Sequence, residues 1–233
     1  MNYPIHEIFH TFQGEGVHMG KAAFFVRLYG CPVHCPWCDS AGTWHPKWVP
    51  NFVRRLSAEA IAGEARVSNA GISVITGGEP TIHDLAALAS ALRAEGMMRH
   101  LETSGGFPIT GDWDWITLSP KRWKPPLPIN VILAHEFKLI IEKPEDIEFY
   151  LSMIDGDRKR RPLELQAPVW LHPEWSHRAD KVVLNAITEA VKRSGGQGRL
   201  RAGWQLHKFY SADSLDPGSR PLVPLGGDPS KGY

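Results

Sequence analysis

Short apolar segments typical of β-strands alternate with helix-forming segments along most of this 233-residue chain. Strands joined by helices pair in parallel through right-handed crossovers. The alternation therefore predicts an α/β fold, an open, partial parallel β/α barrel of about six strand–helix units, with a doubly wound open sheet as the alternative. We expect strands over residues 3–11, 22–29, 72–76, 100–103, 115–119, 136–141, 163–166 and from 199 onward, and helices over 57–67, 84–95, 144–154 and 179–193.

Polar and glycine-rich motifs follow the predicted strands and favour the barrel over the doubly wound sheet. They begin after Gly30, Thr76, Thr103, Ser119 and Gln166. Each position lies at the carboxyl end of a predicted strand, and the active sites of β/α barrels are built at that end. We therefore expect the functional side chains to gather at one mouth of the barrel.

The composition is that of an ordinary globular protein, with 42% hydrophobic residues and a formal net charge of +1. This balance gives no general indication of a nucleic-acid partner. Residues 1–10 lack the apolar stretch of a signal peptide, and no window is apolar enough for a membrane helix. We expect a cytoplasmic protein that binds neither nucleic acid nor membrane. Residues 1–213 are predicted to form one domain, followed by a proline- and glycine-rich tail over residues 214–233.

The three cysteines of the chain, Cys31, Cys35 and Cys38, lie within eight residues. An odd number of closely spaced cysteines is not a disulfide framework and indicates metal ligands. Three thiolates can hold three irons of a four-iron, four-sulfur cluster and leave the fourth iron open. The alternative is structural zinc, for which His34 would have to be the fourth ligand.

A second motif, Thr76-Gly77-Gly78-Glu79-Pro80, follows the predicted strand over 72–76. Glycines at a strand end let a ligand approach the backbone without meeting a Cβ atom. The neighbouring Glu79 carboxylate could receive an ammonium group. On its own this sequence is common in turns. Its position one strand–helix unit after the cysteines is what indicates a functional role.

The Cys-x3-Cys-x2-Cys loop and the Gly-Gly-Glu-Pro loop together resemble the radical S-adenosylmethionine superfamily. The resemblance implies that the open iron binds the amino and carboxylate groups of S-adenosylmethionine. Reductive cleavage then releases a 5′-deoxyadenosyl radical, which takes a hydrogen atom from a substrate. Trp37 matches an aromatic position that the superfamily places near the adenine, although packing within the loop is the alternative.

Further segments resemble one family of that superfamily, 7-carboxy-7-deazaguanine synthase of queuosine and deazapurine biosynthesis. They are Glu7-Ile8-Phe9, the stretch 11–16 (TFQGEG), Phe25-Val26-Arg27, Cys38-Asp39-Ser40, Leu101-Glu102-Thr103, Ser119-Pro120-Lys121, Glu136-Phe137-Lys138 and Gln205-Leu206-His207-Lys208. The resemblance covers about residues 3–213 and implies a substrate, 6-carboxy-5,6,7,8-tetrahydropterin. Hydrogen abstraction at C6, ring contraction and loss of ammonia would give 7-carboxy-7-deazaguanine.

The same resemblance implies a magnesium ion, an electron donor such as flavodoxin, a homodimer, and a role for each matching residue. Arg27 would pair with the substrate carboxylate and Ser40 would bind magnesium. The pterin would be bound by Phe12, Gln13, Gly14, Glu15 and Thr76. S-adenosylmethionine would be contacted by Trp37, Gly78, Ser119, Lys121 and Gln166.

Several of these roles have structural alternatives. Arg27 lies in an apolar strand and could instead form a structural salt bridge. Lys121 has basic neighbours and could belong to a solvated face. The segment around Gln166 carries one residue more than the family pattern before Pro168, which weakens its assignment. His207 either closes the pocket or ends a strand.

Two other functions remain open from the residues alone. An activase that forms a glycyl radical on a partner protein would share the cysteine spacing and the Gly-Gly loop. The activase hypothesis does not explain the TFQGEG segment or Arg27. A zinc-stabilised binding module would use Cys31, His34, Cys35 and Cys38 as ligands. Iron analysis would distinguish such a module from a protein that carries an iron–sulfur cluster.

Overall fold

The structure is a computed structural model that describes residues 1–158, 167–195, 199–210 and 216–219. Its strands are β1 (Asn2–Phe12), β2 (Ala22–Leu28), β3 (Arg54–Ser57), β4 (Ile72–Gly77), β5 (Met98–Thr103), β6 (Trp115–Leu118), β7 (Glu136–Ile141), β8 (Val169–Pro173) and β9 (Leu200–Ala202). Its α-helices are α1 (Ala58–Val67), α2 (Ala86–Ala94), α3 (Pro128–Leu133), α4 (Glu145–Arg158), α5 (Lys181–Arg193) and α6 (Leu206–Tyr210). Short 3₁₀ turns cover Ala41–Thr43 (η1), Pro80–Ile82 (η2) and Trp175–His177 (η4).

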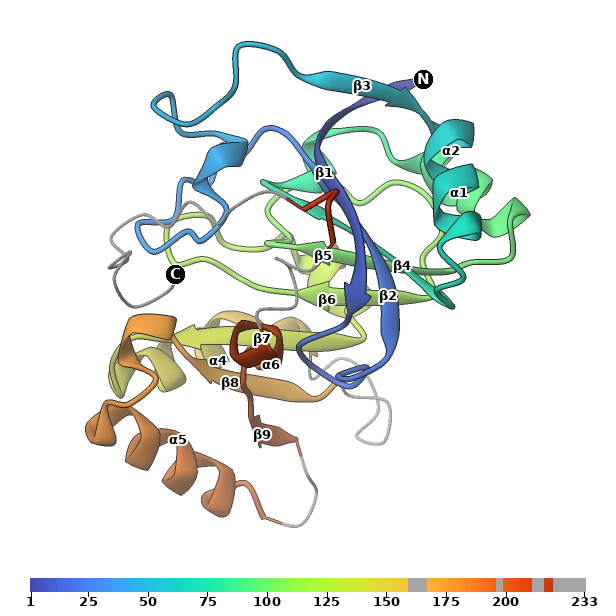
Figure 1. Ribbon diagram of the computed structural model, residues 1–233. Helices are drawn as coiled ribbons and strands as arrows, with labels where there is room; N and C mark the ends of the chain where they lie inside the picture. Colours follow the sequence, from blue (N-terminus) through green and yellow to red (C-terminus); the bar gives the residue numbers. More distant parts are fainter. Residues whose placement is uncertain (159–166, 196–198, 211–215, 220–233) are drawn as a thin grey trace.

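The nine strands form one curved sheet in the order β3-β1-β2-β4-β5-β6-β7-β8-β9 (Figure 1). Every pairing from β2 to β9 is parallel. The sheet ends at β3 and β9 without closing, which confirms the prediction of an open, partial β/α barrel. The departure from a wholly parallel sheet is at the N-terminus, where β1 pairs antiparallel with both β2 and β3. The connection from β1 to β2 is too short for a crossover helix, so the two strands form a hairpin.

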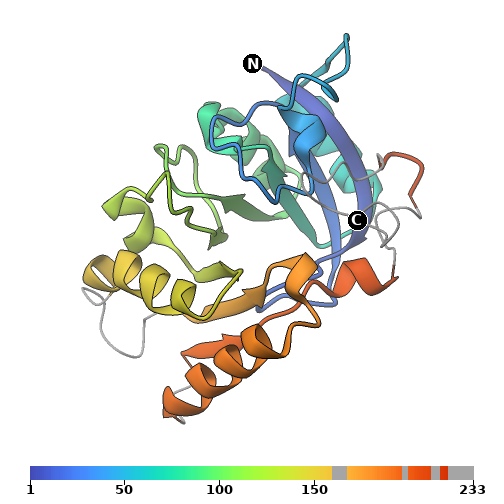
Figure 2. The ribbon, with the colours of Figure 1, turned by 90° about the vertical axis from the view of Figure 1, so that its left-hand side faces the viewer.

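Helices α1, α2, α4 and α5 lie on the outer face of the sheet (Figure 2) and form two apolar cores with it. Helices α1 and α2 cover β1, β2, β4 and β5 with side chains such as Ile61 and Leu88. Helices α4 and α5 cover β7 and β8 with side chains such as Ile154 and Ile187. Ser57 caps α1 by accepting a hydrogen bond from the Ala60 N–H at 3.2 Å, as its predicted position requires. The two cores leave the carboxyl ends of the parallel strands for polar groups.

Some predicted elements differ from the observed ones. The strand expected over residues 163–166 falls outside the described residues, and β8 at Val169–Pro173 was not predicted. The segment 206–210 is the helix α6, so the alternative in which His207 ends a strand is wrong. Strand β3 and helix α3 were not predicted, because they are too short to show a clear hydrophobic periodicity. Among the described residues, no helix combines the length and apolar character required to cross a membrane.

Candidate active site

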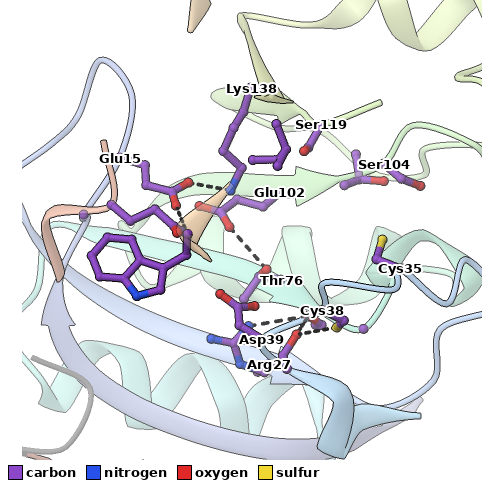
Figure 3. Close-up of a pocket in the computed structure, with 18 of the residues that line it drawn as sticks. Glu15, Arg27, Cys35, Cys38, Asp39, Thr76, Glu102, Ser104, Ser119 and Lys138 are labelled. Carbon is purple, nitrogen blue, oxygen red and sulfur yellow. Dashed lines mark hydrogen bonds and ion pairs between the residues drawn. The ribbon is translucent and has the colours of Figure 1, made fainter. Parts of the chain in front are cut away.

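A cavity of about 210 Å³ opens where the parallel strands end, at the concave mouth of the sheet. Its walls come from the loops after β1, β2, β4, β5 and β6, from β7 and from α6 (Figure 3). The cavity brings together every predicted site residue that the structure describes: Phe12, Gln13, Gly14, Glu15, Arg27, Cys31, Cys35, Trp37, Cys38, Ser40, Thr76, Gly78, Ser119 and Lys121. Gln166 lies outside the described residues. The shared location is observed, and the individual roles stay predictions.

The three cysteines line one end of the cavity as free thiols. Burial, together with the charges of the other two cysteines, raises the pKa of the Cys35 thiol to about 12 against the opposing charge of Lys121. Burial likewise raises the pKa of Cys31 and of Cys38. Three adjacent thiolates are therefore stable only beside strong positive charge, which iron supplies when it binds. The thiol trio fits an iron–sulfur cluster.

The zinc alternative requires His34 beside the thiols. The His34 ring instead stacks on Trp44, with 4.1 Å between ring centroids. Within the described part of the chain, no three His, Cys, Asp or Glu side chains are arranged to hold a single metal ion. A cubane is larger than one ion, so its ligands need not converge on a point.

The glycine-rich loop after β4 lies directly against the cysteine loop. A Cβ atom on Gly78 would come 2.1 Å from the Gly30 carbonyl oxygen, so only glycine permits this approach. The Glu79 N–H donates to the same Gly30 oxygen at 2.8 Å. Packing between the two loops therefore accounts for the glycine, and contact with the cofactor is an additional prediction.

The Glu79 carboxylate is buried and connects the loop after β4 with the end of β5. It accepts hydrogen bonds from the hydroxyl groups of Thr81, Thr103 and Ser104 at 2.5–2.7 Å, and from the backbone N–H groups of Thr81 and Ser104. These five bonds occupy the acceptor capacity of a carboxylate. Glu79 thus fixes the ends of β4 and β5, whereas the sequence suggested that it would receive an ammonium group.

Lys121 and Trp37 form the wall next to the cysteines. The Lys121 ammonium donates to the Ser119 hydroxyl at 2.7 Å and lies 5.4 Å from the centre of the Trp37 ring. The Trp37 indole N–H donates to Glu142 at 3.0 Å. Burial lowers the pKa of Lys121. Lys121 is only 8% exposed, which excludes the solvated basic face considered as its alternative.

The opposite end of the cavity is a partly buried network of amide and charged side chains. Glu102 accepts hydrogen bonds from the Gln13 amide at 2.9 Å and from the Thr76 hydroxyl at 3.3 Å. The Lys138 ammonium donates to Glu15, which also accepts from the Gln205 amide at 2.9 Å. Burial alone would raise the pKa of Glu15, but the charge and hydrogen bond of Lys138, together with His172 and His207, hold that pKa below its usual range. Both members of the Glu15–Lys138 pair are therefore ionised.

Arg27, Ser40 and Asp39 lie between the two ends of the cavity. The Arg27 Nε donates to Glu7 at 2.6 Å, so the salt bridge foreseen for this arginine is present while its guanidinium also lines the cavity. The Ser40 hydroxyl lies 3.7 Å from Cys38 Sγ. The Asp39 carboxylate pairs with Lys208 at 3.0 Å, and this charge keeps the pKa of Asp39 low against the effect of its burial.

Helix α6 closes the cavity beside the loop that carries Gln13 and Glu15. The Leu206 N–H donates to the Gly14 carbonyl at 3.0 Å, and the Tyr210 ring meets the Phe12 ring edge-on at 5.6 Å. The His207 ring occupies the space where a Cβ atom on Gly14 would lie. His207 therefore lines the pocket, as one of its two alternatives proposed.

The pocket residues to which sequence reasoning gave no role hold the site through hydrogen bonds and ion pairs with partners from distant segments. They are Asp39, Glu102, Lys138, Gln205 and Lys208. All five belong to segments that carry the family resemblance, which is the signal that could have found them.

Comparison with known proteins decides between the alternatives. A family of 4Fe-4S single cluster domains matches residues 12–110. The 7-carboxy-7-deazaguanine synthase of Synechocystis is 39% identical over 211 residues, which cover 90% of this chain and 93% of that relative. The corresponding synthase of Flavobacterium psychrophilum is 37% identical over 208 residues, 89% of this chain and 91% of the relative. The chain belongs to the 7-carboxy-7-deazaguanine synthase family.

A solved structure agrees with this membership. The crystal structure of QueE from Escherichia coli superposes with a TM-score of 0.73 at 30% identity, covering 89% of this chain and 95% of the other. As a member of the 7-carboxy-7-deazaguanine synthase family, the chain is a radical S-adenosylmethionine enzyme with an iron–sulfur cluster and S-adenosylmethionine as cofactors. The glycyl-radical activase and the zinc module are thereby set aside.

Proposed function

We propose that the cavity converts 6-carboxy-5,6,7,8-tetrahydropterin into 7-carboxy-7-deazaguanine, with ring contraction and loss of ammonia. When bound, the cluster and S-adenosylmethionine supply a radical that removes the hydrogen atom from C6 of the substrate. The observation that carries the proposal is that three thiols and a partly buried amide-and-carboxylate network line opposite ends of one cavity. Cofactor and substrate would therefore share a single cavity.

The cofactor end is formed by the cysteine loop and its neighbours. Cys31, Cys35 and Cys38 would hold the cluster. Trp37, Gly78, Ser119 and Lys121 lie around the thiols and would contact S-adenosylmethionine, and Gln166 is proposed for the same role. Lys121 supplies a buried positive charge beside Cys35, which favours binding of anionic groups there.

The substrate end is complementary to the pterin. The Gln13 amide and the Thr76 hydroxyl meet at Glu102, and the ring edge of a pterin offers the same mixture of donors and acceptors. Phe12 contributes an apolar wall, Gly14 allows the chain to pass close to α6, and Glu15 is held in place by Lys138. These contacts would bind the ring in one orientation and exclude water.

The substrate carboxylate and a magnesium ion would lie between the two ends. Arg27 is directed there with Nε held by Glu7, an arrangement that fixes the guanidinium plane. Ser40 offers a hydroxyl oxygen, the ligand type that magnesium prefers, and the ion would keep most of its waters. The Asp39 carboxylate beside Ser40 adds negative charge to this region.

We further propose a cytoplasmic homodimer that receives electrons from a carrier such as flavodoxin and binds neither nucleic acid nor membrane. A reducing compartment preserves the free thiols before the cluster assembles. Residues 1–213 are proposed to act as one catalytic domain and residues 214–233 as its tail.

The proposal is tested by anaerobic turnover. Protein reconstituted with iron and sulfide is incubated with reductant, S-adenosylmethionine and the carboxy-tetrahydropterin, and the product is identified by mass spectrometry. We expect 7-carboxy-7-deazaguanine, with S-adenosylmethionine regenerated, and faster turnover when magnesium is added. An intact cluster with no product would contradict the proposed substrate.

A further inference from the structure

Glu136 is a buried carboxylate to which the proposed reaction gives no role. It is the first residue of β7, and it lies outside the residues that line the active-site cavity. Successive side chains of a strand point to opposite faces of the sheet. Phe137 packs in an apolar core, whereas Lys138 lines the cavity, so Glu136 shares the inner face with Lys138. Glu136 therefore lies inside the barrel, deeper than the cavity.

Within the described residues, three neutral groups donate hydrogen bonds to the Glu136 carboxylate. Oε1 accepts the Thr117 hydroxyl at 2.7 Å, and Oε2 accepts the Trp170 indole N–H at 3.0 Å. Thr117 and Trp170 belong to β6 and β8, the strands on either side of β7, so they fix the carboxylate in the sheet. The third donor, at 2.9 Å from Oε2, is the backbone N–H of Val17 in the loop between β1 and β2.

The same carboxylate fills the space beside Gly16. Gly16 has a φ of +69°, in the left-handed region that favours glycine. A Cβ atom on Gly16 would lie 2.4 Å from Glu136 Oε1 and 2.6 Å from Oε2, so the carboxylate and a side chain at this position exclude each other. Glu136 thus contacts two consecutive loop residues, Gly16 by packing and Val17 by a hydrogen bond.

The residues just before Gly16 are those proposed to bind the pterin. The Glu15 N–H donates to the Gln13 side-chain oxygen at 3.2 Å, and the Lys138 ammonium donates to the Glu15 carboxylate (Figure 3). A displacement of Gly16 passes to Glu15 along the chain and from Glu15 to Gln13 through this hydrogen bond. Strand β7 therefore holds the loop at two points, Lys138 at a side chain and Glu136 at the backbone.

We propose that Glu136 is a positioning residue that fixes the backbone of the loop at Gly16 and Val17. The pterin-binding side chains of Gln13 and Glu15 are thereby held in place. The inference rests on the proposed function and adds to it a residue below the cavity. Because the donors to the carboxylate are neutral, its oxygen atoms hold the loop and its negative charge is not required.

The test compares Glu136→Ala with Glu136→Gln in the reconstituted full-length chain. Glu136→Ala removes the acceptor of the Val17 N–H, so the pterin KM should rise roughly tenfold while the S-adenosylmethionine KM changes by less than about twofold. Glutamine keeps an acceptor oxygen for the loop and can donate its amide to the Thr117 hydroxyl. Glu136→Gln should therefore keep the pterin KM within about threefold of the wild-type value.

Thr117→Val is the matched control, because it removes a donor to the same carboxylate and leaves the contact with the loop. It should keep both wild-type KM values. Hydrogen exchange, followed by mass spectrometry of the peptide that spans residues 13–19, measures the loop without turnover. We expect exchange roughly tenfold faster in Glu136→Ala and close to the wild-type rate in Glu136→Gln and Thr117→Val.

A second pair of variants reaches the same contact from the loop and keeps the test decisive if Glu136→Ala does not fold. Gly16→Ala brings a Cβ atom against the carboxylate and should raise the pterin KM roughly tenfold. Gly20→Ala, in the same loop, is the control: Gly20 has a φ of +84°, and a Cβ atom there would meet nothing within 4 Å. Equal KM values in the two glycine variants would mean that backbone strain alone acts, and would overturn the inference.

The other outcomes are equally decisive. A folded Glu136→Ala protein with the wild-type pterin KM or the wild-type loop exchange overturns the inference, as does an equal rise in both KM values. Loop exchange in Glu136→Gln as fast as in Glu136→Ala overturns it too. Wild-type protein that carries its cluster and forms no product would contradict the proposed function instead, and the exchange measurements would still decide the role of Glu136.

Discussion

At the scale of single residues, the cavity is built from three cysteines within eight consecutive residues and from ion pairs between segments far apart in the chain. Lys138 and Glu15 are 123 positions apart, and Lys208 and Asp39 are also brought together only by the fold. Such pairs depend on how distant strands and helices pack, and local sequence does not encode that. The sequence therefore indicated the cofactor, while the structure was needed to show how the opposite end of the cavity is built.

Cys35→Ala tests whether the chain still folds when it can no longer bind the cluster. Cys35 lies in a loop outside the two apolar cores, so its loss removes a ligand and little packing. We expect iron content to fall from about four per chain to near zero, while the free energy of unfolding of the metal-free protein changes by no more than about 1 kcal/mol. Iron analysis and denaturant titration measure the two effects. Loss of the folded state in the metal-free variant would contradict this prediction.

Arg27→Ala separates substrate binding from structural pairing. Removing the guanidinium leaves the Glu7 carboxylate, with 4% of its side chain exposed, without the 2.6 Å ion pair. We expect the free energy of unfolding to fall by roughly 3 kcal/mol. KM should rise at least tenfold for the pterin and change little for S-adenosylmethionine.

The double variant Glu7→Gln/Arg27→Ala removes the buried Glu7 charge together with Arg27. Denaturant titration should show recovered stability, while steady-state kinetics should still show the raised pterin KM. If both the free energy of unfolding and the pterin KM returned to wild-type values, Arg27 would have a purely structural role.

At the scale of secondary-structure elements, periodicity located the long helices well. The range predicted from 57 to 67 is α1 with its Ser57 cap, and β7 has the predicted bounds 136–141. The prediction was wrong at residues 206–210, where the alternative of a strand end is replaced by helix α6. The strand predicted over 163–166 lies outside the described residues, and the strand that pairs with β7 is β8 at Val169–Pro173, which was not predicted. Residues 206–210 became helical because they pack over the Gly14 loop.

Lys208→Met tests whether α6 is held closed by its ion pair with Asp39. The Lys208 side chain is only 5% exposed, so its charge needs Asp39 as a partner. Neutralising it should loosen α6, speed hydrogen exchange at residues 205–210 and raise the pterin KM roughly tenfold. Lys192→Met, which breaks an exposed pair with Glu189, is the matched control. Equal exchange in Lys208→Met and the control would show that the pair does not hold the helix.

At the scale of the whole molecule, the buried His172 makes stability depend on pH. Burial lowers the pKa of His172 to about 4, and the ring is 1% exposed behind Glu15 and Lys138. An unfolded histidine titrates near pH 6.5, so between about pH 6.5 and 4 the unfolded chain binds the extra proton. The contribution of the neutral His172 ring to the free energy of unfolding is fully present above pH 6.5 and is lost as the pH falls toward 4.

Denaturant titrations at pH 7 and pH 4 measure this effect. Between those values, the wild type should lose roughly 3 kcal/mol more of its free energy of unfolding than His172→Leu loses. His10→Ala, at an exposed position, should behave like the wild type. Identical losses in the wild type and His172→Leu would mean that the ring is not kept neutral by burial.

The function rests on a metal assembly that leaves one iron without a protein ligand. The most direct measurement is iron and sulfide analysis of anaerobically reconstituted protein, followed by electron paramagnetic resonance before and after S-adenosylmethionine is added. We predict about four irons and four sulfides per chain and a spectrum that changes when the sulfonium compound binds the open iron. A loaded cluster whose spectrum S-adenosylmethionine leaves unchanged, or a chain that never takes up iron and sulfide, would contradict the account.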